Sequence, residues 1–179
     1  MNKRIMAIAV LLAGSMLGAQ VNAKPSSGVM SSLNVYSYSK EVSDSPGGDS
    51  KMSTRVYDIK VGYIGASGLY LGGMYTTRSD ESGSSTTDGN ALAASIGYVG
   101  EAGVYIMGHY IVSAKFGDYK EGTGFKADLG YLYMVNNVVF VGAELTYRSI
   151  DYKKNDSIPN LDSHKVSETF PMLSVGVVF

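Results

Sequence analysis

The chain of 179 residues contains no cysteine, no tryptophan and only two histidines. Without cysteine it has no disulfide framework, no lipid anchor on cysteine and no thiolate ligand for a metal. The histidines form neither a His-x-x-x-His pair nor a close pair with a carboxylate at metal-site spacing. We therefore expect no metal and no cofactor, and we assign no metal-binding, cofactor-binding or catalytic residue.

Charge is also scarce. Charged residues make up 17% of the chain, with 15 Lys and Arg against 16 Asp and Glu. The first 23 residues hold two of the basic residues and no acidic one, so the remaining chain has a net charge of −3. This balance does not favour nucleic acid as a partner.

Long apolar runs are missing except near the start of the chain. Lys3 and Arg4 precede an apolar run at 5–17, and Val21-Asn22-Ala23 has the form of a cleavage site. This pattern is typical of a secretory signal peptide. A membrane anchor is the alternative, but the run is shorter than the roughly 18 residues of a spanning helix. We assign 1–23 to a cleaved signal peptide and 24–179 to one domain.

Glycine and tyrosine are abundant and follow a repeat. Gly-Tyr-x-Gly-x-x-Gly-x-Tyr is present at 62–70 and 97–105, and a weaker copy begins at Gly130 and turns at Asn136-Asn137. These motifs contain no lysine and precede no helical pattern, so they are not phosphate-binding loops. Their glycines permit the positive φ angles of tight hairpins. The motifs therefore predict three short turns between strands.

Long polar stretches alternate with these short turns. They lie at 41–51, 79–90, 116–122 and 150–164 and hold 11 acidic residues against four lysines. Their Ser, Thr, Gly and Asp content predicts mobile loops with an acidic rim. Short turns at one end of a strand meander and long loops at the other are typical of an outer-membrane β-barrel.

Period-2 alternation between the turns predicts eight strands, near 29–40, 52–64, 69–78, 91–99, 104–115, 123–134, 138–149 and 165–179. Each has about the length that a tilted strand needs to cross a bilayer. The predicted fold is an all-β, eight-stranded antiparallel up-and-down transmembrane barrel. Its first strand alternates poorly. Pro171 should mark a bulge or a strand start, because a closed barrel has no free edge for a residue without N–H.

The alternation also predicts which side chains face lipid and which face the lumen. Tyrosines near both ends of the strands should form an aromatic girdle: Tyr57, Tyr63, Tyr75, Tyr98, Tyr110, Tyr131, Tyr133 and Tyr147. The inward charged residues should form a lumenal network: Asp58, Lys60, Arg78, Lys115, Lys126, Asp128, Glu144, Arg148 and Glu168. In so narrow a barrel these charges must pair with each other or with trapped water.

The chain ends on Leu173, Val175, Val177 and Phe179, which alternate with small or polar residues. With the signal segment and the eight-strand meander, this ending resembles the small outer-membrane β-barrel superfamily, in particular the OmpA transmembrane domain and OmpX-like barrels. The resemblance implies that these four residues are read by the barrel-assembly machinery. It also implies a Gram-negative outer membrane, extracellular loops and a periplasmic N-terminus and short turns. The family's usual pattern has an aromatic residue where Val177 stands.

Our first expectation for function is a non-enzymatic integral outer-membrane protein with a structural or surface-interaction role. Its partners would be outer-membrane lipid and lipopolysaccharide, and an extracellular ligand at the loops. A narrow, low-conductance, porin-like pore is the main alternative. A lipid-modifying barrel enzyme using His109 or His164 is less favoured. A soluble periplasmic barrel for a small apolar ligand would need apolar residues inside and polar residues outside.

Overall fold

The computed structural model describes residues 25–44, 48–158 and 163–179. The expected signal peptide at 1–23 lies outside these residues. Eight strands follow one another in the chain: β1 (Gly28–Asp44), β2 (Gly48–Ile64), β3 (Leu69–Ser82), β4 (Ser85–Val99), β5 (Val104–Phe116), β6 (Tyr119–Met134), β7 (Val139–Asn155) and β8 (His164–Val178). No helix among the described residues is long and apolar enough to cross a membrane.

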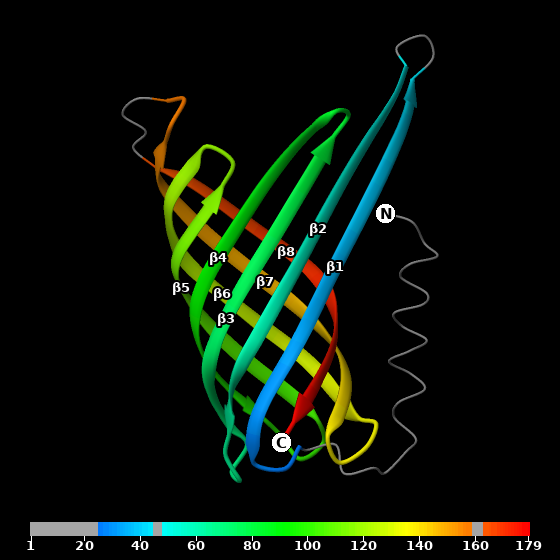
Figure 1. Cartoon of the computed structure of the whole chain (residues 1–179), viewed down its shortest axis with the longest axis vertical. Helices are drawn as coiled ribbons and strands as arrows, with labels where there is room; N and C mark the ends of the chain where they lie inside the picture. The colour runs from blue at the N-terminus through cyan, green and yellow to red at the C-terminus, as the bar shows by residue number, and fades with distance from the viewer. Residues whose placement is uncertain (1–24, 45–47, 159–162) are drawn as a thin grey trace.

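Each strand pairs with its sequence neighbours in an antiparallel sheet, and β1 pairs with β8 to close the barrel. Figure 1 shows tilted strands around a narrow interior, with the β1–β2 hairpin extending furthest from the end where the C-terminus lies. The predicted all-β, eight-stranded meander is therefore confirmed.

The two faces of the wall follow the predicted alternation. In β2, Tyr57, Ile59 and Val61 are exposed on the outside, whereas Asp58 and Lys60 are buried inside. The expectation that β1 alternates poorly is wrong for its first half, where Asn34 is buried and its neighbours point outward. In β5 the pairing shifts after Ile111, so the inward and outward faces exchange there. This exchange affects a residue that the sequence analysis assigned to the lumen.

The short turns lie at 65–68, 100–103 and 135–138, at the end of the barrel that holds the C-terminus (Figure 1). Gly68 and Gly103 adopt φ angles of 93° and 82°, as the repeated motif predicts for tight turns. The third turn uses a side chain instead. The amide oxygen of Asn136 accepts hydrogen bonds from the N–H groups of Val138 and Val139, at 2.8 and 2.7 Å.

The four long mobile loops expected from the composition are largely absent from the described residues. The 79–90 stretch instead continues the β3–β4 ladder to Ser82 and Ser85, with Gly83 at a φ of 59° in the turn. The 116–122 stretch has a turn at 117–118 between β5 and β6. The ladder extends because each added pair satisfies two backbone groups and because Thr and Ser pair well across strands. Polar composition was therefore a poor guide to where the strands end.

Glycines elsewhere in the wall make room for aromatic rings in the lumen. The rings at the ends of the repeated motifs, Tyr70 and Tyr105, are buried at 1% and 5% exposure. A Cβ on Gly62 would lie 2.6 Å from Cζ of Tyr70, and a Cβ on Gly130 would lie 2.5 Å from Cζ of Tyr105. In both pairs a glycine on one strand makes room for a ring from the neighbouring strand.

We expect Gly130→Ala to destabilise the barrel by about 1–3 kcal/mol, because the added methyl group overpacks Tyr105. Gly108→Ala is the matched control on neighbouring β5, since the nearest atom to its Cβ is 4.0 Å away. Urea unfolding of the refolded protein measures both changes. Equal stability of the two variants would contradict this role for Gly130.

The wall closes unevenly between β1 and β8. The β1–β2 ladder runs to Asp44 and the β7–β8 ladder runs to His164, but β1 and β8 pair only from Met30↔Val178 to Val35↔Leu173. Beyond these pairs the described parts of β1 and β8 face each other without a ladder. We call this stretch, 36–44 of β1 and 164–172 of β8, the open seam.

Pro171 explains where the seam begins. Val29 and Phe179 exchange both backbone hydrogen bonds, at 2.7 and 3.0 Å. Such pairs alternate along an antiparallel ladder, so Leu173 bonds to β1 and the next residue of β8 to do so would be Pro171. Proline has no N–H and cannot extend the ladder. The expected bulge or strand start is therefore wrong: Pro171 pairs in regular register with β7 and lies at an open edge toward β1.

Candidate functional site: the charged lumen

The lumen is filled by three layers of side chains. The layer nearest the short turns is apolar and contains Met30, Ile64, Tyr70, Val99, Tyr105, Met107, Leu132, Met134, Phe140 and Val178. The middle layer is a network of buried charges. The layer farthest from the short turns holds two arginines, a glutamate and an apolar cluster that includes Ile111 and Tyr152. The charged layers lie where the period-2 pattern of β2, β6 and β7 turns Asp, Glu and Lys inward.

Two lysines are the centre of the middle layer. Lys60 Nζ lies 2.6 Å from Asp128 Oδ2 and 2.8 Å from Glu144 Oε2. Lys126 Nζ lies 2.5 Å from the same Asp128 oxygen and 3.1 Å from Asp58 Oδ2. The side chains of these lysines are at most 4% exposed. Because an unpaired buried charge is costly, this geometry places every charge of the layer beside an opposite one.

Neutral donors complete the network. Thr146 and Thr76 donate hydroxyl hydrogen bonds to Asp128 and Asp58, at 2.8 and 2.6 Å. Tyr105 donates to Glu144 at 2.5 Å. Sequence analysis assigned the charges to the lumen but gave these hydroxyls no role. The sequence did contain evidence for such a role, because Thr76 and Thr146 share the inward phase of their strands. Tyr105 also occupies the same motif position as the buried Tyr70.

His109 joins the same network. Its Nε2 lies 2.8 Å from Asp128 Oδ2, and its Nδ1 lies 2.7 Å from Ser95 Oγ. The order of Ser, His and Asp is that of a hydrolase triad. Ser95 and His109 are however buried at 6% and 2% exposure, and Asp128 is shared with two lysines. A nucleophile must meet a substrate, and the burial of this serine disfavours that, so we read the arrangement as part of the packing of the lumen.

The upper layer is a bridge of three charged groups. Glu168 accepts hydrogen bonds from Arg78 Nη1 at 2.5 Å and from Arg148 Nη2 at 2.7 Å, and Arg78 also pairs with Asp80 at 2.7 Å. Phe116 and Phe170 lie under the guanidinium groups of Arg78 and Arg148, at 4.9 and 5.4 Å. The bridge thus links β3, β7 and β8 across the lumen.

On β8 the bridge lies beyond the last strongly exposed large apolar side chain, Leu173. Ser167 and Thr169, which flank Glu168, are polar and point outward. Burial alone would raise the pKa of Glu168, but the charges and hydrogen bonds of Arg148 and Arg78 outweigh it and hold the pKa below its usual range. The carboxylate therefore stays ionised at acidic pH where a free glutamate is protonated.

The other predicted site residues are placed as follows. Lys115 is exposed, so its assignment to the lumen is wrong; the pairing shift in β5 turns it outward and puts Phe116 inward. The girdle tyrosines all point outward, six of them strongly exposed and Tyr131 and Tyr133 partly so. Of the proposed assembly signal, Leu173, Val175 and Phe179 are exposed on the outside. His164 stacks on Tyr119, with ring centroids 4.4 Å apart, at the outer end of the barrel.

No three His, Cys, Asp or Glu residues in the described parts of the chain are arranged to hold a metal ion. Comparisons with known proteins assign no family, because no family model and no curated protein matches the sequence. Functional inference therefore rests on the geometry of the barrel itself.

Removing a lumenal lysine should lower the stability of the barrel far more than removing a lysine on its outside. We expect Lys60→Met to lower the free energy of unfolding by about 3–5 kcal/mol, because Asp128 and Glu144 lose a buried partner. Lys120→Met breaks the exposed pair with Asp156 and should cost less than about 1 kcal/mol. Denaturant unfolding of both variants provides the measurement. Similar losses would refute the view that the middle layer holds the barrel together.

Protonation of Glu168 should weaken the upper layer. Its lowered pKa means that the stabilisation is complete above the pKa of an unfolded glutamate, about 4.3, and is lost as pH falls through the folded value. Glu168→Gln removes the charge at every pH. We expect the wild type to be more stable at pH 7 and the difference in thermal midpoint to shrink towards pH 3. A difference independent of pH would contradict the charged bridge.

Proposed function

We propose that this protein is an integral β-barrel of a bacterial outer membrane, with a structural or surface-interaction role carried by its outer hairpins. The supporting observation is a band of apolar side chains around the outside of the wall. Every strand contributes to it: Val29, Leu33, Ile59, Val61, Leu69, Leu71, Leu92, Ile96, Val104, Ile106, Phe125, Leu129, Leu145, Leu173 and Val175 are 40% exposed or more. In water such a surface would be costly, and in a bilayer it is the favoured surface.

Polar side chains border this band toward the outer hairpins. Arg55 and Glu81 pair on the outside at 3.2 Å, beyond the exposed rings of Tyr57 and Tyr75. Tyrosines at both edges of the apolar surface suit the water–lipid interface. The charges inside and the apolar groups outside are the reverse of what a soluble barrel for an apolar ligand needs. The proposed orientation puts the short turns in the periplasm and the long hairpins outside the cell.

The proposal assigns no enzymatic activity and no open channel. Eight strands enclose little more than their own side chains. Lys60, Lys126, Asp128 and Glu144 are buried and fill the middle of the barrel, above a layer of apolar side chains. An ion would have to displace paired charges and then pass the apolar layer, which disfavours the porin-like alternative. We further propose outer-membrane lipid, lipopolysaccharide and the assembly machinery as partners, and a ligand at the hairpins.

A charge on the outward band tests the membrane location. We expect Leu129→Arg to destabilise the barrel in lipid by about 2–4 kcal/mol, as at the middle of a bilayer. Thr77→Arg, outside the band beyond Tyr75, should change stability little. The free energy of unfolding of each refolded variant in lipid gives both effects. Cell fractionation locates the wild type, and a heat-dependent gel shift verifies that the barrel has folded. Recovery of the wild type in the soluble periplasm, or equal effects of the two arginines, would exclude the proposal.

Conductance separates the structural role from the pore. The refolded wild type should be silent in a planar bilayer, because its charged middle layer is closed. The folded state is verified by the gel shift in the same preparation. Discrete and reproducible current steps would overturn the structural proposal in favour of a pore.

A further inference from the structure

The open seam leaves polar backbone groups without a ladder partner across the gap. On β8, Thr169 and Ser167 have the same phase as Leu173, whose backbone bonds to β1, so their N–H and C=O groups point across the seam. On β1, Ser37 and Ser39 do the same from the other side. Among the described residues this is the one place where both edges of the wall face a gap. These four residues are exposed, so their backbone groups are open to water or to the polar head of another molecule.

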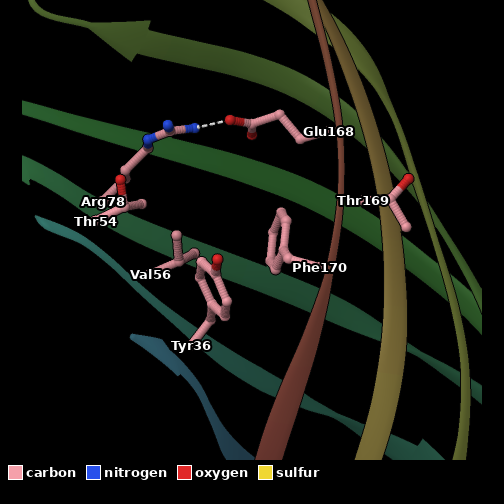
Figure 2. A pocket seen from close by; sticks show the side chains of 7 residues that line it. All are labelled: Tyr36, Thr54, Val56, Arg78, Glu168, Thr169 and Phe170. Atoms are coloured by element: carbon pink, nitrogen blue, oxygen red, sulfur yellow. Dashed lines mark hydrogen bonds and ion pairs between the residues drawn. The ribbon is translucent and has the colours of Figure 1, made fainter. Parts of the chain in front are cut away.

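A cavity of about 150 Å³ lies at this seam. Its wall consists of Tyr36 from β1, Thr54 and Val56 from β2, Arg78 from β3, and Glu168, Thr169 and Phe170 from β8. Figure 2 shows the rings of Tyr36 and Phe170 and the side chain of Val56 together, with Arg78 and Glu168 at one end. Thr169 is an outward residue, whereas the other residues point inward. The cavity therefore reaches from the lumen through the seam to the outside of the barrel.

The two ends of the cavity differ in chemistry. Tyr36 and Phe170 pack with ring centroids 4.9 Å apart beside Val56, which is buried at 1% exposure. Arg78 and Glu168 close the opposite end with their ion pair, and Thr54 and Thr169 add hydroxyl groups. Donors and acceptors are thus both available at one end, and apolar carbon at the other. A dry apolar cavity of about 150 Å³ is known to hold one benzene ring.

We propose that the seam cavity is a binding site for a small amphiphile with a benzene-sized apolar group and a neutral hydrogen-bonding head. The apolar group packs against Tyr36, Val56 and Phe170. The head contacts the Arg78–Glu168 pair and the free backbone groups of the seam. A neutral head is favoured because Arg78, Arg148, Asp80 and Glu168 balance one another in charge.

The Arg78–Glu168 pair also forms a partition. A second cavity of about 90 Å³ lies in the upper lumen, among residues that include Phe116, Tyr152 and His164, and it shares Arg78 and Glu168 with the seam cavity. The pair therefore separates the seam from the upper end of the lumen. The buried network around Lys60 and Lys126 lies on the other side, so the proposed ligand enters through the seam or past the ion pair, and not from the short turns.

The test uses 4-fluorobenzyl alcohol as the probe and fluorine NMR as the readout. The full chain after signal removal is refolded in detergent micelles and in lipid nanodiscs, and empty micelles and nanodiscs give the background from partition. We expect saturable binding to the wild type above this background. Binding in micelles tests the cavity without assuming the proposed membrane location, so failure of one proposal is distinguishable from failure of the other.

Two variants change the cavity in opposite directions. Val56→Phe fills it and should weaken binding at least tenfold. Phe170→Ala enlarges the cavity and should shift the binding preference toward a fluorinated naphthalenemethanol, which the wild type excludes. If Val56→Phe does not fold, Phe170→Ala alone tests whether the probe binds in the cavity. Leu145→Phe, on the outward face of β7, is the control and should bind as the wild type does. Uptake that never saturates, or binding that neither cavity variant changes, would overturn the proposal.

Discussion

The need to pair buried charge governs the interior of this barrel. Lys60 and Lys126 are shielded from solvent in the middle of the lumen, and three carboxylates converge on them from β2, β6 and β7. Lys126 and Asp128 lie two residues apart on β6, but Lys60 of β2 reaches Asp128 and Glu144 only when the wall curves into a barrel. The charged layer therefore stabilises the closed barrel relative to any open sheet of the same strands.

Below the charged layer, the packing of aromatic rings against glycines also stabilises the barrel. Tyr105 packs over Gly130 and directs its hydroxyl to Glu144, so one side chain joins the apolar layer to the charged one. Above the charges, Glu168 joins Arg78 of β3 to Arg148 of β7. The three layers are consecutive levels of one packed lumen. A filled lumen of this kind stiffens the wall, which suits a protein whose outer hairpins extend far beyond the packed layers.

The sequence predicted the parts of this structure that depend on period and on turn chemistry. The alternation in β2 assigned Asp58 and Lys60 to the lumen, and the glycine motifs assigned two turns correctly. It did not predict the pairings, because Lys60 and Asp128 are 68 residues apart and meet only through closure. Lys115 was misassigned because a shift of pairing in β5 leaves no mark on the alternation. The outer stretches were misread because Ser and Thr suit both a loop and a solvated hairpin.

Pro171 shows how a local conflict with the fold becomes a feature of it. A closed barrel disfavours proline, since each residue of the wall is expected to donate a backbone hydrogen bond. Here the conflict is resolved by ending the β1–β8 ladder at Leu173, while β8 keeps its full register with β7. The cost is confined to one seam, and the rings of Tyr36 and Phe170 pack across it in place of the missing bonds. Because the opening is at the border of the apolar band, it joins a polar lumen to the outer surface without breaking the charged layer that holds the barrel closed.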